Sequence, residues 1–338
     1  MRRRVLASSL PLAVLASMFF GGIAGAQTPI AISYFPGSGA GPIFAGIEQG
    51  FFAKEGLAVT AEATSGSVAQ ITAMLDDRYQ IGFGGLDDVI AYDVGQGEVP
   101  VKHKADLFAF MGTDSGSLHL VTAPDVPNIK ALKGRTVAVD AKTTGFAFVL
   151  YRIAALNGLK PGDYDVLSVG SSQKRLEALS QGRAQAAVMF KPVADQLAAK
   201  GFHDLMPISD VLPHYQAAVA LARRSWALPH RRALVGFIRG YIAASRWFLD
   251  PANKDGAIAL LVKYTPGASP QAAAGVYAAA VAFANAAAIG RIDRAGVATA
   301  VSLRETYGEP RKKLGDPRQF YDLSYYRAAT AEVRHAAP

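Results

Sequence analysis

The sequence predicts an α/β protein of two lobes, each built on a mainly parallel sheet flanked by helices. Strand and helix patterns alternate through both halves of the chain, which is typical of parallel sheets. One unit occurs twice, because residues 64–92 and 171–196 both have the pattern of a helix that begins at serine, a short strand and a polar segment after the strand. From residue 229 the pattern becomes helical, and this C-terminal region is expected to pack on the first lobe.

The first lobe alternates from its opening strand. Pro42 in a first turn and Gly50 after a last turn delimit one helix. Ser67 stands three positions before Gln70, and this capping-box pattern predicts the start of the next helix. The expected order is a strand over 29–33, a helix over 42–49, a tight turn over 51–57, a strand over 58–63, a helix from 67 and a strand over 80–83.

Turn-rich residues 112–119 follow an apolar strand pattern over 99–111, and they mark the first crossover between lobes. The second lobe is expected to contain strands over 118–122, 136–139, 184–190 and within 201–209, and helices over 146–156 and from 171. Residues 215–222 return the chain to the first lobe, and helices are expected over 231–249, 255–264, 270–288 and 294–306. Lobe 1 therefore comprises 27–112 and 215–338, and lobe 2 comprises 113–214.

Residues 1–26 have the pattern of a cleavable export signal. Three arginines precede an apolar stretch, and a small-x-small pattern ends at Ala26, so we expect cleavage there and a periplasmic protein by the Sec or the twin-arginine route. Removing the signal lowers the net charge from +8 to +5, and the remaining basic residues are scattered, which disfavours nucleic-acid binding. The absence of cysteine excludes disulfides and thiolate chemistry. We expect a monomer.

Four segments occur in the order found in one known family: GFFAKEGL at 50–57, KALKGRTVAV at 130–139, ALSQG at 178–182 with its following strand and Pro192, and DLSYY at 322–326. The chain resembles the periplasmic solute-binding proteins of ABC importers in the SsuA/TauA and NMT1/THI5-like family. The resemblance implies a two-lobe periplasmic binding protein fold, type II-like. It also implies hinge closure on a small-molecule ligand in the cleft and delivery to an ABC permease in the inner membrane. Hinge strands are expected near Met111 and Tyr215.

Three positions depart from the family pattern. Gln80 and Gln185 stand where the family usually has aspartate in the strand after the Leu-x-x-Gly turn, and Arg78 stands where a glycine is expected. These departures suggest local structural changes in both repeated units.

Open α/β sheets hold ligands at the edge where the strands end. Most of the family's cleft-lining positions fall in the loops predicted at that edge. The ligand-binding candidates are Tyr34, Phe35, Ser65, Gly66, Ser67, Gly85, Asp87, Asp88, Thr143, Thr144, Gly145, Phe146, Phe190 and Lys191. We expect no catalytic residue, metal or cofactor among them.

The chemistry of these candidates leaves the ligand class open. Helix openings at 65–67 and 143–145 suit a sulfonate, taurine, nitrate or a carboxylate, because unpaired N–H groups and the helix dipole favour anions. Asp87 and Asp88 beside aromatic rings instead suit an amine or a thiamine-precursor pyrimidine. Alternatively, the two aspartates only cap a helix that begins at Val89.

Two other functions stand beside transport. A periplasmic ligand-sensor module would have the same sequence features. An enzyme of the THI5-like group is the other alternative, since some relatives make the thiamine pyrimidine. Those relatives rely on a cysteine-rich iron site that this chain cannot build, so such an enzyme would have to work without iron. The six histidines show no metal-binding spacing, and no Gly-x-Ser-x-Gly elbow occurs, so a binding protein is favoured over an enzyme.

Overall fold

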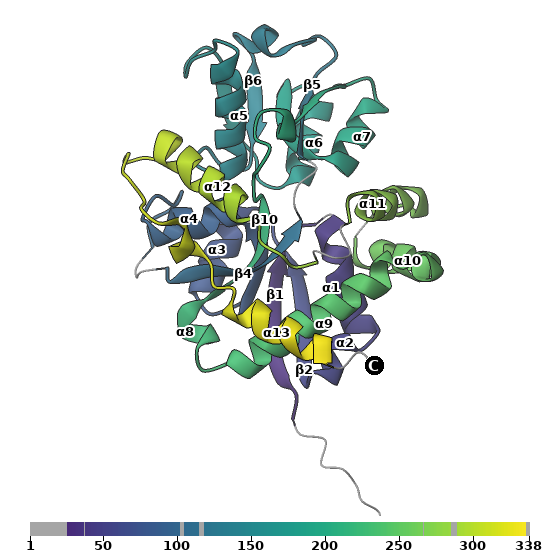
Figure 1. Cartoon of the computed structure of the whole chain (residues 1–338). Helices are drawn as coiled ribbons and strands as arrows, with labels where there is room; N and C mark the ends of the chain where they lie inside the picture. Colours follow the sequence, from purple (N-terminus) through teal and green to yellow (C-terminus); the bar gives the residue numbers. More distant parts are fainter. Residues whose placement is uncertain are drawn as a thin grey trace, which may run out of the picture.

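The chain folds into two α/β lobes, one above the other in Figure 1, in a computed structural model. The structure describes residues 26–36, 38–101, 105–114, 118–265, 267–284 and 289–335. The expected export signal therefore lies almost wholly outside the described residues, as do parts of the expected strand over 99–111, of the crossover over 112–119 and of the helix over 270–288. The predicted two-lobe α/β class is confirmed.

Lobe 1 is the first sheet together with the helices packed on it. Its elements before the first crossover are β1 (Thr28–Tyr34), α1 (Gly41–Glu48), α2 (Phe51–Lys54), β2 (Leu57–Ala63), α3 (Ser67–Leu75), β3 (Ile81–Gly85), α4 (Leu86–Asp93) and β4 (Leu107–Asp114). After the return crossover come β10 (Ala218–Arg223), α8 (Arg224–Ala227), α9 (Arg231–Leu249), α10 (Lys254–Tyr264), α11 (Pro270–Phe283), α12 (Arg294–Tyr307) and α13 (Ser324–His335).

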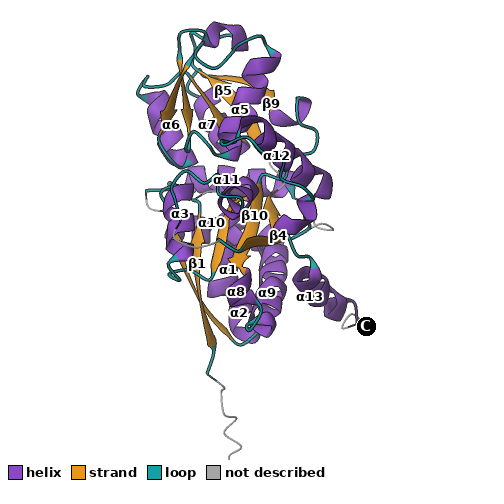
Figure 2. Ribbon diagram, turned by 90° about the vertical axis from the view of Figure 1, so that its left-hand side faces the viewer, coloured by secondary structure: helices purple, strands orange, loops and turns teal. Residues whose placement is uncertain are grey.

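Lobe 2 is the second sheet with its own helices. Its elements are β5 (Leu118–Thr122), β6 (Thr136–Val139), α5 (Gly145–Leu156), β7 (Asp165–Ser168), α6 (Ser172–Ser180), β8 (Ala186–Phe190), α7 (Lys191–Ala198) and β9 (His203–Pro207). Figure 2 shows both sheets with helices packed around them. Helices on both faces exclude water from the apolar strands.

The two sheets follow one plan. Their strand orders are β2-β1-β3-β10-β4 and β7-β6-β8-β5-β9. β1 pairs in parallel with β2 and β3, and β6 pairs in parallel with β7 and β8. β10 and β5, which follow the two crossovers, pair in antiparallel fashion with both neighbours. Since only β10 and β5 are reversed, the other four strands of each sheet run in the same direction, and each sheet is mainly parallel in this sense, as expected.

The repeated unit occupies the same place in both lobes. α3, β3 and α4 are separated from α6, β8 and α7 by 105 residues at every boundary. Gln80 and Gln185 occupy equivalent positions, and their side-chain carbonyls accept from the N–H groups of Ala31 at 2.8 Å and Thr136 at 3.0 Å. Both glutamines therefore join their unit to the neighbouring parallel strand, which gives these departures from the family pattern a structural role.

Several local expectations need correction at the start of helices. α3 has Gly66 as its N-cap, and no side chain caps it, so the capping box of Ser67 and Gln70 is wrong. The amide of Gln70 instead donates to the carbonyls of Ser33 at 3.0 Å and Phe83 at 3.2 Å, which lie on β1 and β3. α4 begins before Val89, and the expected tight turn at 51–57 contains the short helix α2.

Other elements differ in extent. β4 begins at Leu107, so most of the apolar pattern over 99–111 precedes the strand. The sequence reading did not predict β7 or α7. β7 has only four residues with no fully buried side chain, so its apolar pattern is weak. The Pro192 at the start of α7 was interpreted as part of a polar exit, although proline suits the first turn of a helix.

α12 packs on both lobes, against α4 and α5 (Figure 1). Arg304 of α12 is fully buried, and its Nε donates to Oδ1 of Asp87 at 2.7 Å. Its Nη1 donates to the carbonyl of Gln96 at 3.2 Å, and its Nη2 donates to Asp87 and to the carbonyl of Thr143 on lobe 2. The guanidinium also lies 4.7 Å from the ring centroid of Phe148 on α5. One side chain therefore contacts both lobes.

The Arg304–Asp87 pair is a charged pair. Burial favours the neutral form of Arg304, but the attraction and hydrogen bond of Asp87, together with Asp88 and Tyr215, outweigh it and raise the pKa of Arg304 above its ordinary value. Removal of one partner would leave the other charge buried without compensation.

We therefore expect Asp87→Ala to lower the free energy of unfolding by about 3–5 kcal/mol, because it leaves the Arg304 cation unpaired. Urea denaturation of the chain without residues 1–26 measures this. Glu177→Ala is the control, since Glu177 pairs with Lys174 at 3.3 Å on the surface of α6 and its loss should cost less than about 1 kcal/mol. Equal losses for the two variants would contradict the structural role of the buried pair.

Candidate functional site

A cavity of about 100 Å³ lies between the lobes, and we call it the interlobe cavity. Loops at the ends of β1, β3, β6 and β8 form much of its wall, together with the return crossover. Nine of the predicted ligand-binding residues line it: Tyr34, Phe35, Gly85, Asp87, Asp88, Thr144, Gly145, Phe146 and Phe190. It is also lined by Asp140, Ser172, Arg175 and Tyr215, which the sequence reading did not select.

The predicted helix opening at residues 65–67 does not line the interlobe cavity. The carbonyl of Ser65 accepts from the N–H of Ser171 on lobe 2 at 3.1 Å. The N–H of Ser67 donates to the carboxylate of Asp140 on lobe 2 at 3.2 Å. Gly66 lies beside the same carboxylate. This opening is therefore a contact between lobes, and an anionic side chain already occupies the N-terminus of α3.

Two further candidates lie away from the cavity wall. The hydroxyl of Thr143 donates to the carboxylate of Glu98 on lobe 1 at 2.5 Å. Lys191 pairs with Asp195 one helical turn along α7, and it lies 3.6 Å from Asp204 of β9. The positive charge expected from Lys191 is thus paired within lobe 2.

The lobe 1 wall carries two buried carboxyl groups. Asp87 belongs to the pair with Arg304, which accounts for its charge. Asp88 is also buried in the first turn of α4, where Gly85 is the N-cap. Desolvation raises the pKa of Asp88 well above its ordinary value, with added repulsion from Asp140 and Asp87, while Arg304 and the N–H of Gly85 oppose the shift. The two aspartates therefore have different roles, although they are adjacent.

The lobe 2 wall is formed by the first turns of α5 and α6. Phe146 of α5 and Phe190 at the end of β8 pack edge to face, with ring centroids 5.7 Å apart. Arg175 of α6 lies 5.7 Å from the Phe146 ring centroid and is only 2% exposed. Its Nη1 donates to the carbonyl of Gly170 and its Nη2 to the hydroxyl of Ser172, both at 2.8 Å. Within the described part of the chain, its buried Nε has no hydrogen-bond partner.

Sequence reasoning missed Arg175 for an identifiable reason. It lies inside α6, where an arginine in a polar helix is usually a solvated residue. The signal available was the repeat, because Arg175 is equivalent to the buried Gln70 of the first unit, 105 residues earlier. Burial lowers the pKa of Arg175 to about 10, with Asp140 acting in the opposite direction, so the guanidinium remains protonated at neutral pH.

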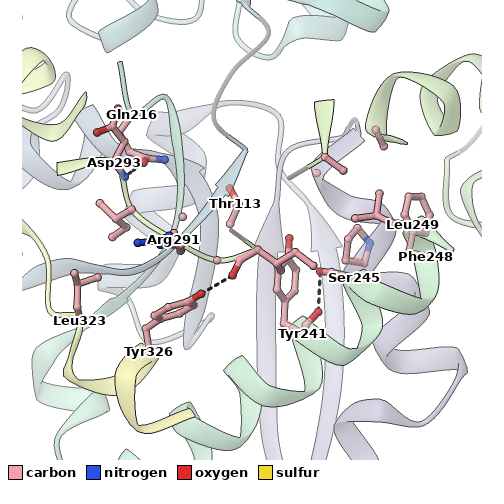
Figure 3. Close-up of a pocket in the computed structure, with 18 of the residues that line it drawn as sticks. Thr113, Gln216, Tyr241, Ser245, Phe248, Leu249, Arg291, Asp293, Leu323 and Tyr326 are labelled. Atoms are coloured by element: carbon pink, nitrogen blue, oxygen red, sulfur yellow. Dashed lines mark hydrogen bonds between the residues drawn. The ribbon is translucent and has the colours of Figure 1, made fainter. Parts of the chain in front are cut away.

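A second and larger cavity, of about 910 Å³, is lined mostly by lobe 1, with Pro192 of lobe 2 also on its wall (Figure 3). The hydroxyl of Tyr326 donates to the carbonyl of Ile289 at 2.7 Å, and the hydroxyl of Ser245 donates to the carbonyl of Tyr241 at 2.8 Å. None of the predicted ligand-binding residues lines this cavity. The polar groups that converge from both sheets lie in the interlobe cavity instead.

The model of the NMT1-like family matches residues 24–262. The chain belongs to the NMT1-like family. A curated relative from Bacillus subtilis (strain 168), YtlA, whose name describes it as a binding protein, is 22% identical to this NMT1-like chain over 218 residues. The match covers 63% of this chain and 64% of YtlA, so the chain spans less than two thirds of that relative's length.

Solved structures share the fold of this NMT1-like protein at low identity. The periplasmic nitrate-binding protein NrtA from Synechocystis PCC 6803 matches with a TM-score of 0.72 and 11% identity, over 91% of this chain and 89% of NrtA. The alkanesulfonate-binding protein SsuA from Xanthomonas axonopodis pv. citri, bound to MOPS, matches with a TM-score of 0.68 and 15% identity, over 87% of this chain and 96% of SsuA. The expected type of binding-protein fold is confirmed.

An enzyme shares the fold as well. The desulfurization enzyme DSZB matches with a TM-score of 0.61 and 13% identity, over 91% of this chain and all of that chain. Its similarity is lower than that of NrtA and SsuA. Within the described residues, no helix has both the length and the apolar character needed to cross a membrane.

The protonation of Asp88 predicts a pH effect on stability. Its raised folded pKa means that the native state retains a proton that the unfolded state loses above about pH 3.8. This contribution to stability is fully present below pH 3.8 and is lost as the pH rises through the folded pKa. Relative to Asp88→Asn, the wild-type free energy of unfolding should therefore fall by about 1.4 kcal/mol per pH unit across that window.

Urea denaturation of both proteins between pH 4 and 7 measures the difference in slope. Glu177→Gln controls for the loss of one surface carboxylate. Parallel stability curves for the wild type and Asp88→Asn would show that Asp88 ionises in the folded protein as it does in the unfolded chain.

Proposed function

We propose that this chain is the extracytoplasmic solute-binding component of an ABC importer. It captures a small organic molecule or anion in the interlobe cavity, closes on it by hinge motion and delivers it to a permease in the inner membrane. The observation that carries this proposal is the interlobe cavity, whose wall combines residues of both sheets with Thr113 and Tyr215 near the two crossovers. A ligand there contacts both lobes at once and so favours their closure.

The contacts between lobes support a closing motion. Two single hydrogen bonds join facing loops of the two lobes. One runs from the N–H of Ser67 to the carboxylate of Asp140, and the other from the N–H of Ser171 to the carbonyl of Ser65. Opening of the lobes exchanges such bonds for bonds to water, at a net cost of about 1 kcal/mol each. A ligand that bridges the walls adds the differential affinity that shifts the equilibrium toward the closed form.

The proposed compartment is the periplasm, with the export signal removed after Ala26. The family match supports this placement, as do the names of relatives such as NrtA and SsuA, which describe them as binding proteins. We further propose that the mature chain is a monomer, since one chain supplies both walls of the cavity.

The ligand is small. A cavity of about 100 Å³ is smaller than a 150 Å³ cavity that binds benzene, so the closed form accommodates a compact molecule. Phe146 and Phe190 offer apolar faces, and Arg175 and Asp88 offer polar groups on opposite walls. The candidate ligands are a sulfonate such as taurine, the nitrate ion, a small carboxylate or a thiamine-precursor pyrimidine.

DSZB supports the rival proposal of an enzyme, because it has the same fold. Against it, this chain has no cysteine for thiolate chemistry. In the interlobe cavity, Asp87 is paired with Arg304 rather than positioned as a free base. Recovery of a bound ligand with unchanged mass after prolonged incubation would favour binding over catalysis. A neighbouring sensor-kinase gene in place of a permease gene would favour the sensor alternative.

A thermal-shift screen of the chain without residues 1–26 tests the proposal. Sulfonates, nitrate, carboxylates, aminopyrimidines and amines are the probes. A probe at 100 times its dissociation constant should stabilise the fold by about 2.7 kcal/mol, which raises the melting temperature by several degrees.

The site of binding is tested by two variants of α5. Phe146→Ala should weaken binding of the active probe roughly tenfold, because it removes an aromatic wall of the cavity. Leu156→Ala is the matched control, since Leu156 is 54% exposed at the other end of the same helix. Equal affinities for the two variants would show that the probe binds elsewhere.

A further inference from the structure

We propose that Arg175 is the anchor for an anionic group of the ligand, so that the interlobe cavity takes a small organic monoanion with an apolar body. This inference rests on the proposed function and deepens it, because it names the residue and the charge that select the ligand. Arg175 was absent from the candidates predicted from the sequence. The helix opening at 65–67, which was among them, has a different role in the structure.

Two arginines are buried among the described residues, Arg175 and Arg304, and their surroundings differ. Arg304 is fully buried and has the carboxylate of Asp87 in direct contact. Arg175 is 2% exposed, but within the described residues no carboxylate lies within ion-pair distance of it. A buried cation is stable only when an anion or hydrogen-bond acceptors compensate its charge. Arg304 has that compensation in direct contact, whereas Arg175 bonds to two neutral acceptors and feels the Asp140 carboxylate only through space.

The guanidinium of Arg175 has donor capacity that the protein does not use. Its Nη1 and Nη2 each donate one bond, to Gly170 and Ser172. A guanidinium has five N–H donors, and the buried Nε–H of Arg175 has no acceptor among the described residues. Because Arg175 lines the interlobe cavity, a carboxylate or sulfonate oxygen there would place a negative charge beside its guanidinium and accept from its remaining donors.

The repeat shows what this position does when no cation is present. Gln70 is the equivalent residue of lobe 1, and its amide bonds to carbonyls of β1 and β3 beneath it. Gln70 does not line the interlobe cavity. Arg175 is longer, bonds to its own loop rather than to the strands, and does line the cavity. The fold therefore needs only a neutral amide here, and the arginine adds a charge directed at the ligand.

Other features of the lobe 2 wall favour an anion at the same place. Gly145 and Phe146 belong to the first turn of α5, Ser172 begins α6, and all three line the cavity. The first N–H groups of a helix have no intrahelical partner, and they carry the positive end of its dipole. Two helix N-termini and one guanidinium thus converge on this wall.

Acidic residues of both lobes set the orientation of the ligand and the number of its charges. Asp140 of lobe 2 accepts from the N-terminus of α3 on lobe 1, so a ligand anion is excluded from that opening. Asp88 lines the opposite wall, where its carboxyl group can hydrogen-bond an uncharged group but offers no partner to a second anion. The anionic end of the ligand therefore faces Arg175, and its other end is apolar or uncharged.

Isothermal titration with matched probes tests the inference on the chain without residues 1–26. Propionate and methanesulfonate, which are smaller than benzene, are the anionic probes, and propionamide and methanesulfonamide are their uncharged counterparts. We expect each anion to bind about ten- to hundredfold more tightly than its amide, because a charged partner for Arg175 is present only in the anion. The two anionic probes separate a carboxylate ligand from a sulfonate ligand.

Arg175→Gln is the decisive variant, since glutamine already fits the equivalent position in lobe 1. It should reduce anion affinity about ten- to hundredfold and leave amide affinity nearly unchanged. Arg175→Lys should restore part of the preference, because lysine keeps the charge without the planar donor geometry. Lys174→Gln is the control, since it removes one positive charge from the exposed neighbour on α6 and should preserve the preference.

Three outcomes would overturn the inference. Equal affinity of the wild type for an anion and its amide would show that the site does not select charge. An unchanged anion preference in Arg175→Gln would show that Arg175 only supports its loop. Failure of both anions to bind the wild type would exclude the monoanion class. In each case the proposed function stands or fails separately, by the thermal-shift screen that also contains amines, aminopyrimidines and nitrate.

Discussion

The buried contact between Arg304 and Asp87 fixes a cation of lobe 1 at the boundary with lobe 2. Arg304 comes from α12, contacts Asp87 and Gln96 on lobe 1, and also bonds to the carbonyl of Thr143 on lobe 2. Asp87 and Arg304 both belong to lobe 1, so opening of the lobes would leave this pair intact and would break only the bond from Arg304 to Thr143. In the proposed closing motion we therefore expect α12 to stay with α4, while the facing loops around Ser67 and Asp140 separate.

The same contact relates the fold to the site. Asp87 and Asp88 lie side by side in the first turn of α4 and both line the interlobe cavity, so the partner of Arg304 is also part of the ligand wall. Gly145 packs against Asp87 and the hydroxyl of Tyr215, and a Cβ there would meet both at less than 3 Å. A glycine at this position lets α5 approach lobe 1 closely. The proposed closing motion would therefore change the separation of the cavity walls directly.

Much of the fold was predictable from sequence because parallel α/β units have strong local patterns. The strands that became β1, β3, β6 and β8 were expected within one or two residues of their observed bounds, and their exits supplied most of the cavity wall. The capping box at Ser67 was wrong because Gln70 has long-range partners on β1 and β3, which a local pattern cannot contain. Short elements such as β7 were missed because four half-exposed residues have little periodicity.

The site was harder to predict than the fold, because its charges are assigned by contacts between distant segments. Asp87 and Asp88 are adjacent in sequence, but only Asp87 has the buried Arg304 as a partner, from a helix more than two hundred residues later. The same limitation concealed Asp140, whose partner Ser67 lies on the other lobe. No residue type or spacing distinguishes these cases before the chain is folded.

The repeat separates the residues that maintain the fold from those that can change the ligand. Gln80 and Gln185 have the same hydrogen bonds in both lobes, so their role belongs to the shared architecture. Gln70 and Arg175 occupy equivalent places but differ in charge and in partners, and only Arg175 lines the interlobe cavity. A substitution at such a position alters the charge offered to a ligand without disturbing a strand pairing. Ligand selection can therefore diverge widely within this fold, which is consistent with sulfonate-binding and nitrate-binding proteins that share it at 15% and 11% identity to this chain.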